Sequence, residues 1–313
     1  SFRVYHRSLA APPGSPWLRG PRVFQGPGPC RLARVLAAGS PGPGVGGTLT
    51  WAPHVIYDAL RRKFFLYYSV CLSLGVAVAD SPLGPFEDRG VLVSWAIDAF
   101  VLQDPEEEAP GGGPGLYLFY SAIQPLRHFL GTGMSHIYGR RLRSPTELSG
   151  EAAVQLLGPS LPWEFNRTSW FDVRGVTEAP EVLRHGGTYY LMYSGALADS
   201  DTYRIGYATA GAPLGPYTKH EGGPITRPPD PGRAGVFGPG HHSLWRDGRS
   251  GQLWAFYHQQ RTAERGWRRF LCADRLAISD SGLVSLDVTR GAPGTGAEEA
   301  QPPAAEGGTT DEL

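Results

Sequence analysis

A recurring unit of short strands limits how this chain can fold more than any other feature. An aromatic strand, a strand of small residues and a Gly-Pro turn follow one another twice, and weaker copies of the aromatic strand occur twice more. The aromatic strands are expected at residues 63–69, 116–121, 188–194 and 253–258. A loose period of roughly 50 to 70 residues, with about four strands in each unit, is typical of β-propeller blades. The sequence therefore predicts an all-β fold.

The units predict a five-bladed β-propeller whose first blade is incomplete. Four units begin near residues 51, 96, 177 and 240, and residues 2–24 remain as the outer part of a preceding blade within residues 1–47. With 43 glycines and 29 prolines in 313 residues, the composition suits a fold with many turns. We expect one propeller domain over residues 1–292. The polar end, residues 293–313, lacks aromatic residues and is expected to be a disordered tail.

One carboxylate stands out at the start of the third clear unit. Glu178 is followed by Ala179 and Pro180, and proline fixes its own φ and biases the preceding residue towards extended conformations. The backbone just after the glutamate is therefore stiff. Residues 181–184 and 188–194 are expected to pair as strands around a turn at residues 185–187, which contains two glycines.

Charge and cysteine content argue against several kinds of partner. Lys+Arg and Asp+Glu are both 29, so the net charge is zero, and we expect neither nucleic acid nor a membrane as a partner. Three cysteines at positions 30, 71 and 272 are too few and too scattered for a disulfide framework or a zinc site, although one bridge remains open. The charged runs at residues 106–108 and 140–141 are expected to be solvated loops.

Five short motifs occur in a characteristic order. They are Trp51-Ala52-Pro53, Ile97-Asp98, Thr177-Glu178-Ala179-Pro180, the Gly-Pro-Gly-His-His-Ser run at 238–243 and Asp274-Arg275-Leu276. Together they resemble family 43 of the glycoside hydrolases, five-bladed β-propellers that cleave glycans containing arabinose, xylose or galactose. The resemblance covers most of residues 2–293, and it implies a glycan substrate and an inverting mechanism.

The resemblance implies two catalytic roles. Glu178 corresponds to the general acid, and Asp98 corresponds to the residue that orients the acid and tunes its pKa. A glycosidic oxygen leaves readily only when it is protonated, so the acid must keep its proton near neutral pH, which burial and a nearby carboxylate favour. An inverting enzyme also needs a base roughly 6.5 to 9.5 Å from the acid, with room for a water molecule.

The resemblance also implies residues that bind the substrate. Trp51 would form a wall of the sugar pocket, and either Arg261 or Arg268 would clamp sugar hydroxyls. His241 would lie near the propeller axis, where some relatives hold a calcium ion through water. No cofactor is required for the reaction, which leaves a structural calcium ion open.

The first fifty residues depart from the family pattern. They contain neither Asp nor Glu, whereas the family places its base aspartate in the first blade. We therefore expect the chain to be a fragment truncated at its N-terminus and inactive as it stands. A carbohydrate-binding propeller without hydrolytic power is the alternative. A fructan-cleaving relative is disfavoured, because those enzymes carry a cysteine where this chain has Ala179.

Two weak signals concern location. Asn166-Arg167-Thr168 is a glycosylation sequon, and the C-terminal TTDEL resembles an endoplasmic-reticulum retrieval signal with one departure. Together they predict the secretory pathway, either the endoplasmic-reticulum lumen or secretion.

Overall fold

The chain is nearly all β throughout the part that the structure describes. The computed structural model describes residues 2–6, 18–24, 50–70, 72–108, 112–123, 134–167, 173–226 and 235–289. In these ranges the chain forms twenty strands, and the single 3-10 turn η2 covers Pro162–Glu164. No helix in these ranges has the length and hydropathy needed to span a membrane. The predicted tail and most of the predicted first blade lie outside the described residues.

Four antiparallel blades account for most of the strands, and each is named here by its first strand. The β3 blade contains β3 (Thr50–Asp58), β4 (Lys63–Val70), β5 (Ser73–Ala79) and β6 (Glu87–Ser94). The β7 blade contains β7 (Ala96–Glu108), β8 (Pro114–Ile123) and β9 (Met134–Ser144), with β10 (Glu147–Leu148) and β11 (Val154–Leu157) paired to β9. The blade heads thus fall where the sequence predicts them.

The other two blades follow the same order. The β13 blade contains β13 (Val173–His185), β14 (Thr188–Gly195), β15 (Arg204–Ala210) and β16 (Thr218–Lys219), with β12 (Phe165–Arg167) paired to β13. The β17 blade contains β17 (Phe237–Arg246), β18 (Leu253–Gln260), β19 (Arg269–Ile278) and β20 (Val284–Leu286). A parallel pairing between β9 and β13 joins the β7 and β13 blades into one continuous sheet.

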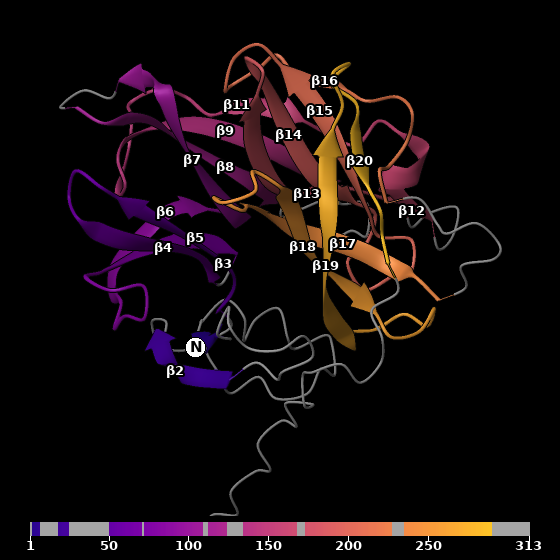
Figure 1. Ribbon diagram of the computed structural model, residues 1–313, viewed down its shortest axis with the longest axis horizontal. Coiled ribbons are helices and arrows are strands. Elements are labelled where there is room, and N and C mark those ends of the chain that lie inside the picture. Colours follow the sequence, from indigo (N-terminus) through magenta and orange to yellow (C-terminus); the bar gives the residue numbers. More distant parts are fainter. Residues whose placement is uncertain are drawn as a thin grey trace, which may run out of the picture.

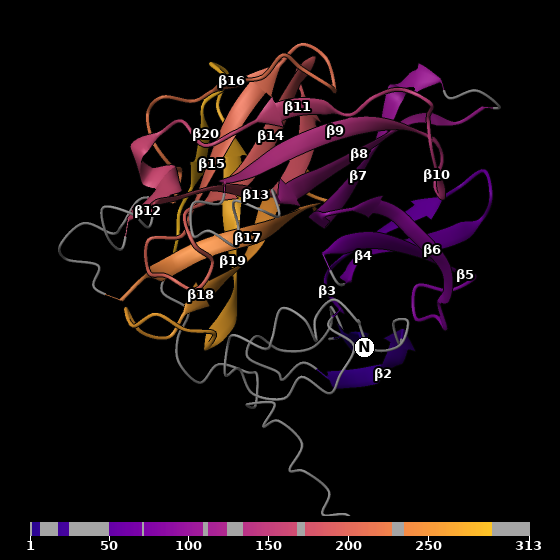
Figure 2. The same ribbon diagram turned by 180° about the vertical axis from the view of Figure 1, so that it is seen from behind.

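The blades are arranged as a fan around a common axis (Figures 1 and 2). Their first strands contact one another in chain order, β3 with β7, β7 with β13 and β13 with β17. The pair formed by β1 (Phe2–His6) and β2 (Leu18–Phe24) is a separate antiparallel sheet on the side of the β3 blade (Figure 1). The first strand of every blade therefore lines the axis.

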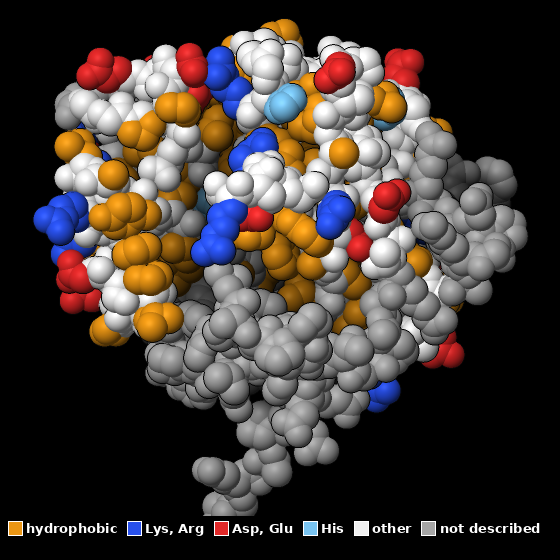
Figure 3. All heavy atoms as spheres, viewed as in Figure 1, with side chains coloured by type: hydrophobic (Ala, Val, Ile, Leu, Met, Phe, Trp, Pro, Cys, Tyr) orange, Lys and Arg blue, Asp and Glu red, His pale blue; other side chains and the backbone are white. Residues whose placement is uncertain are grey.

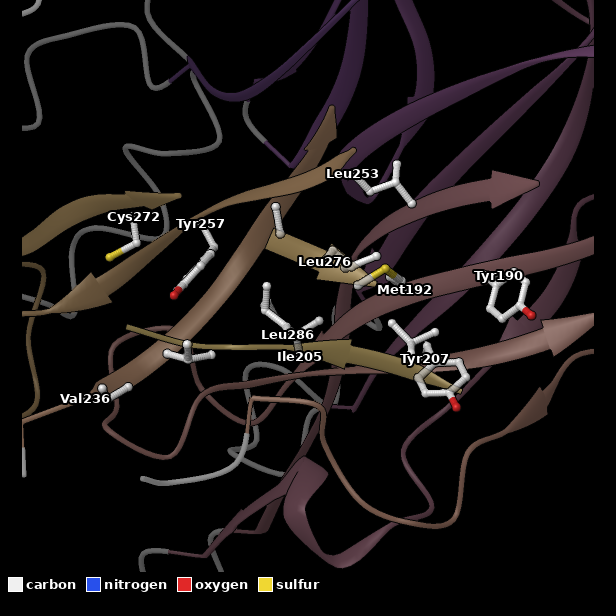
Figure 4. Close-up of a cluster of buried hydrophobic side chains, with 13 residues drawn as sticks. Tyr190, Met192, Ile205, Tyr207, Val236, Leu253, Tyr257, Cys272, Leu276 and Leu286 are labelled. Carbon is white, nitrogen blue, oxygen red and sulfur yellow. The ribbon is translucent and has the colours of Figure 1, made fainter. Parts of the chain in front are cut away.

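Three of the four hydrophobic clusters among the described residues lie between blades, and the fourth lies within the β3 blade. The cluster in Figure 4 packs Met192 and Ile205 of the β13 blade against Tyr257 and Leu276 of the β17 blade. A second cluster joins the β3 and β7 blades, and a third joins the β7 and β13 blades. Burying one large apolar side chain contributes about 1.5–3 kcal/mol. Because central strands are buried on both faces, their sequences are continuously apolar and aromatic instead of alternating.

The β13–β14 hairpin forms as predicted. His185 pairs with Thr188 across a turn at Gly186 and Gly187, whose φ values are 56° and 81°. Glycine adopts such positive φ angles readily because it has no Cβ. The short turn fixes the register of the whole hairpin, including the pairing of Glu178 with Ser194.

The charged runs lie on strands, which corrects the prediction of loops, while their side chains are exposed or partly exposed as expected. Glu106 and Glu107 lie on β7, where Glu106 is paired with Arg184 at 2.9 Å and Glu107 with Arg141 at 3.1 Å. These acidic and basic side chains belong to different strands that the sheet brings together. On the face shown in Figure 3, Lys and Arg side chains are spread among acidic ones and form no single basic patch.

Cys272 is a buried thiol in the β17 blade, and Cys30 and Cys71 lie outside the described residues.

Candidate active site

Each blade carries the same irregularity near the start of its first strand. Two residues of that strand stand opposite a single residue of the second strand, which is a β-bulge. We call these pairs the head bulges: Ala52-Pro53 on β3, Asp98-Ala99 on β7, Ala179-Pro180 on β13 and His241-His242 on β17. The four family motifs at the blade heads therefore share one backbone feature, a β-bulge that is repeated around the axis.

The first residue of every head bulge has a left-handed backbone. The φ values are 47° for Ala52, 57° for Asp98, 51° for Ala179 and 51° for His241. This conformation costs a non-glycine residue about 1–2 kcal/mol, so packing and hydrogen bonds must hold it in place. Such strained positions cluster at functional sites.

The head bulges enclose a cavity of about 140 Å³ at the axis. Each first strand supplies three consecutive residues to its lining: 52–54, 98–100, 179–181 and 241–243. The cavity therefore draws side chains from four segments far apart in the sequence. Asp98 and His241 belong to this lining, and the carboxylate of Glu178 lies within 4.8 Å of the ligand atoms of both.

Asp98 and Glu178 form a close pair of carboxyl groups. Ligand atoms of Asp98, Glu178 and His241 all lie within 4.8 Å of one another. Glu178 directly precedes its head bulge, whereas Asp98 is the first residue of its own, so the two occupy positions one residue apart in the repeat. The Asp98 carboxylate accepts a hydrogen bond from the Ala179 backbone N–H at 3.2 Å. The pair is thus linked through the peptide that follows Glu178.

The surroundings of this pair favour its protonated form. Burial raises the pKa of Glu178 above its usual value of 4.5, the negative charge of Asp98 raises it further, and the hydrogen bond from Tyr203 opposes both effects. Burial likewise raises the pKa of Asp98, against the hydrogen bond from Ala179. Two adjacent carboxyl groups, one buried and one partly buried, do not readily ionise together, so the pair retains a proton well above the pH range of ordinary carboxylic acids.

Tyr203 is the nearest hydroxyl partner of Glu178. Its phenol donates a hydrogen bond to Glu178 Oε1 at 2.7 Å, and its side chain is fully buried. The ring stacks on His258 with 5.6 Å between centroids, and it packs so closely on Gly240 that a Cβ there would lie 2.2 Å from a ring carbon. Gly240 is therefore required in the Gly-His-His-Ser run to admit this ring.

Tyr203 and Arg269 both contact His258. Arg269 donates to His258 Nε2 at 3.0 Å and to the Ala198 carbonyl at 2.9 Å. Its positive charge is close enough to lower the pKa of Glu178. Burial lowers the pKa of His241, and of His258 to about 3, so both imidazoles are neutral at pH 7.

The structure brings together only some of the residues singled out from the sequence. Glu178, Asp98 and His241 converge on the axis. Trp51 lies at the start of β3, partly buried and directly before its head bulge. Arg261 and Arg268 lie exposed at the two ends of a loop between β18 and β19, joined by a backbone hydrogen bond of 3.1 Å.

Two residues at the site carry no signal in the sequence. Tyr203 precedes β15, and Arg269 begins β19, so Tyr203 contacts Glu178, and the charge of Arg269 acts on it, only through the folding of loops and neighbouring strands. Three aromatic strands end in Tyr-Ser, at residues 68–69, 120–121 and 193–194. These serines are the sequence signal for the hydrogen bonds around the head bulges. Ser69 accepts the Asp98 N–H at 3.0 Å, and Ser194 accepts the His241 N–H at 2.9 Å.

Two carboxylates and a histidine converge in a way that could hold a cation. Calcium prefers six to eight oxygen ligands. Asp98 and Glu178 each already accept a hydrogen bond on one oxygen, from Ala179 and Tyr203, and the His241 nitrogen is a poor direct ligand for calcium. The three residues fit a hydrated ion held partly through water better than a directly coordinated one.

Comparison with known proteins gives consistent matches. The sequence model of the glycosyl hydrolases family 43 matches residues 32–284. The arabinoxylan arabinofuranohydrolase of Bacillus subtilis (strain 168) is 29% identical over 191 residues, which cover 54% of this chain and 33% of that protein. The β-D-galactofuranosidase xynD of Aspergillus niger is 27% identical over 241 residues, which cover 72% and 59%.

A solved structure extends the likeness to the fold. The crystal structure of a thermostable family-43 glycoside hydrolase has a TM-score of 0.66 and 26% identity, and the match covers 88% of this chain and 83% of that one. The chain spans only 32% to 65% of the length of the curated relatives it matches.

Proposed function

The chain belongs to glycosyl hydrolase family 43, and we propose that the protein cleaves O-glycosidic bonds of arabinose-, xylose- or galactose-type glycans with inversion at the anomeric carbon. Its solved relatives confirm the five-bladed β-propeller fold expected from the sequence. The observation that carries the proposal is the carboxyl pair at the axis, where Glu178 is hydrogen-bonded by Tyr203 and lies next to Asp98. The names of the relatives, an arabinofuranohydrolase and a galactofuranosidase among them, support the choice of sugars.

In this proposal Glu178 is the general acid. Its raised pKa keeps the carboxyl protonated near neutral pH, and the proton passes to the glycosidic oxygen as the bond to the anomeric carbon breaks. The Tyr203 hydrogen bond and the positive charge of Arg269 stabilise the carboxylate left behind. Asp98 keeps the acid protonated before the reaction through its charge, and it holds the Ala179 amide.

The base of the reaction has no candidate in the first fifty residues, which contain no carboxylate. We therefore expect this chain by itself to bind glycans and to leave them unhydrolysed. The alternative is a carbohydrate-binding propeller that has the acid pair and lacks the general base.

Chemical rescue separates the two functions. Azide can attack the anomeric carbon in place of base-activated water, so that a C–N bond forms, the C–O bond breaks and the aryl oxide leaves. If the pocket is catalytic, azide restores turnover of 4-nitrophenyl arabinofuranoside and yields a glycosyl azide of inverted configuration. Bound glycan without any azide-dependent product would support the binding protein and refute the hydrolase.

The same assay tests Glu178. General acid catalysis contributes about 10²- to 10⁴-fold for a leaving group that needs protonation, and much less for 4-nitrophenolate. The Glu178→Ala variant should therefore lose azide-supported turnover of a phenyl or alkyl glycoside by about that factor while it largely retains turnover of the 4-nitrophenyl glycoside. Equal losses on both substrates would exclude Glu178 as the acid.

We propose that Trp267 contributes to sugar binding at the edge of the pocket. Its indole is 72% exposed, and the Arg269 guanidinium lies 4.4 Å from its ring centroid. The loop is held by an ion pair of Arg265 with Asp199 at 2.8 Å. Sugar faces stack on exposed aromatic planes, so Trp267→Ala should weaken oligosaccharide binding about tenfold in calorimetry. Trp254→Ala is the matched control and should bind normally, because Trp254 on β18 also packs against a guanidinium, that of Arg275 at 5.6 Å, and lines neither cavity at the axis.

For metals, we propose that proton transfer needs none and that a calcium ion near His241 has a structural role. A cation bound directly to Glu178 would compete with the proton that the acid must carry. Chelation with EDTA should therefore leave azide-supported turnover unchanged while it lowers the melting temperature. Loss of turnover that calcium restores would contradict this assignment.

For location, we propose the secretory pathway on the basis of the sequon and the C-terminal TTDEL. Asn166 Nδ2 is buried and its Oδ1 accepts a hydrogen bond from Thr202 at 3.0 Å, so attachment of a glycan there requires local opening of β12. Expression in a eukaryotic secretory host followed by enzymatic deglycosylation tests the site. A protein of unchanged mobility that stays in the cytosol would refute the proposal.

A further inference from the structure

Three serines hold equivalent places in successive blades. Ser69, Ser121 and Ser194 each pair with the residue directly before the head bulge of their own blade, and each is fully buried. Two of them accept the backbone N–H of the first bulge residue in the next blade. Ser69 accepts the Asp98 N–H at 3.0 Å, and Ser194 accepts the His241 N–H at 2.9 Å.

Ser121 departs from this rule. The amide it should accept is that of Ala179, the first bulge residue of the next blade, but this amide donates to Asp98 Oδ2 at 3.2 Å. The Ser121 hydroxyl is buried and has no hydrogen-bond partner among the described residues. Buried hydroxyl groups are nearly always hydrogen-bonded, so an unpaired one at this position of the repeat requires an explanation.

Asp98 therefore performs two tasks at once. Its carboxylate fixes the peptide that follows Glu178, and its charge adjusts the proton of Glu178. The two tasks conflict whenever the carboxyl of Asp98 rotates away from the Ala179 amide. Without another acceptor, the Ala179 amide would then be buried and unpaired, which is costly, and the left-handed Ala179 would lose its restraint.

We propose that Ser121 is a positioning residue that serves as the second acceptor for the Ala179 amide, so that Asp98 can release this amide without disturbing the direction of Glu178. The amide passes from one acceptor to the other, and no covalent bond changes. The exchange of acceptors follows from the repeat alone, and only its use in catalysis rests on the proposed function.

Amide hydrogen exchange at Ala179 tests the proposal in the chain as it is, without any need for turnover. Ser121→Ala alone should leave the exchange rate within about threefold of wild type, because Asp98 holds the amide. Asp98→Ala alone should also have a small effect, because Ser121 takes over. The double variant should exchange on the order of tenfold faster than the two single effects combined, since the amide then has no acceptor.

Ser69→Ala supplies the matched control. The Asp98 amide has Ser69 as its recorded acceptor, so this single substitution should speed exchange at Asp98 on the order of tenfold. If Ser121→Ala alone speeds exchange at Ala179 equally, Ser121 already holds the amide and the proposal is overturned. It is also overturned if the double variant exchanges no faster than Asp98→Ala.

A second measurement decides the matter if the double variant does not fold. In a crystal structure of Asp98→Ala, Ser121 Oγ should lie within hydrogen-bond distance, about 3 Å, of the Ala179 nitrogen. A hydroxyl that stays turned away, with water on the amide, would refute the role. Failure of the azide rescue would refute the proposed hydrolase activity without changing the hydrogen-exchange or crystallographic results. The proposed function and the role of Ser121 can therefore be refuted independently.

Discussion

The hydrogen bond from Tyr203 to Glu178 offers the sharpest test of how this site sets its acid. Tyr203→Phe removes the phenol oxygen 2.7 Å from Glu178 Oε1 and retains the ring that stacks on His258. The hydrogen bond lowers the pKa of Glu178, because it stabilises the carboxylate more than the protonated form. Its removal should therefore raise this pKa further.

The magnitude follows from the strength of a hydrogen bond to a charged group. Such a bond contributes about 1.5–3 kcal/mol, and one pKa unit corresponds to about 1.4 kcal/mol. Since Glu178 is partly exposed, we take the lower part of this range and expect a rise of about 1 unit. The ¹³C shift of the labelled Glu178 carboxyl, followed from pH 4 to pH 10, measures it directly.

Tyr193→Phe is the matched control. Tyr193 is also buried and donates from its phenol to a glutamate, Glu164, at 2.6 Å, but on the outer side of the site. This variant should lose stability by about 1–3 kcal/mol and leave the titration of Glu178 unchanged. A Glu178 pKa that stays constant or falls in Tyr203→Phe would refute the reasoning.

Two further predictions concern stability. Gly240→Ala places a Cβ 2.2 Å from the Tyr203 ring and should lower the free energy of unfolding by about 1–3 kcal/mol in urea denaturation, whereas Gly248→Ala meets open space and should change it by less than about 0.5 kcal/mol. Burial raises the pKa of Glu181 to about 8, against a hydrogen bond from the Leu244 N–H, so the protein takes up a proton there on folding. The stabilisation from the proton on Glu181 is complete below about pH 4.5 and is lost as the pH rises through about 8. Glu181→Gln should therefore be more stable than wild type by roughly 2–4 kcal/mol at pH 9 in thermal or urea denaturation. Equal stability at that pH would contradict the burial of Glu181.

The sequence predicts those parts of the fold that local chemistry determines. The four blade heads, the aromatic strands and the Gly186-Gly187 turn follow from strand length, apolar continuity and the conformational freedom of glycine. The order of the head motifs likewise identifies Glu178 and Asp98 as candidate catalytic residues. These features depend on a few neighbouring residues, so they can be read without knowledge of the whole chain.

The rest of the site depends on tertiary structure. Arg268 and Arg269 are adjacent in the sequence, but neighbouring residues of a strand point to opposite faces, and the pairing of Arg269 with Gln260 decides which one faces His258. No local pattern specifies that register. Tyr203 is similarly invisible, because its contact with Glu178 requires the β15 loop to pack against Gly240. The one-residue offset between Glu178 and Asp98 becomes apparent only when the blades are superimposed by register.

The head bulges have a consequence for protein engineering. All four share one backbone shape, which a serine on the preceding blade helps to hold in two of them, while the two bulge residues themselves range from Ala-Pro through Asp-Ala to His-His. The same bulge can therefore carry different side chains. Exchanging the short segments at 97–99 and 178–180 would move a carboxyl group around the axis by one blade while the scaffold stays the same, so new arrangements of reactive groups can be built by permutation instead of by redesign of the fold.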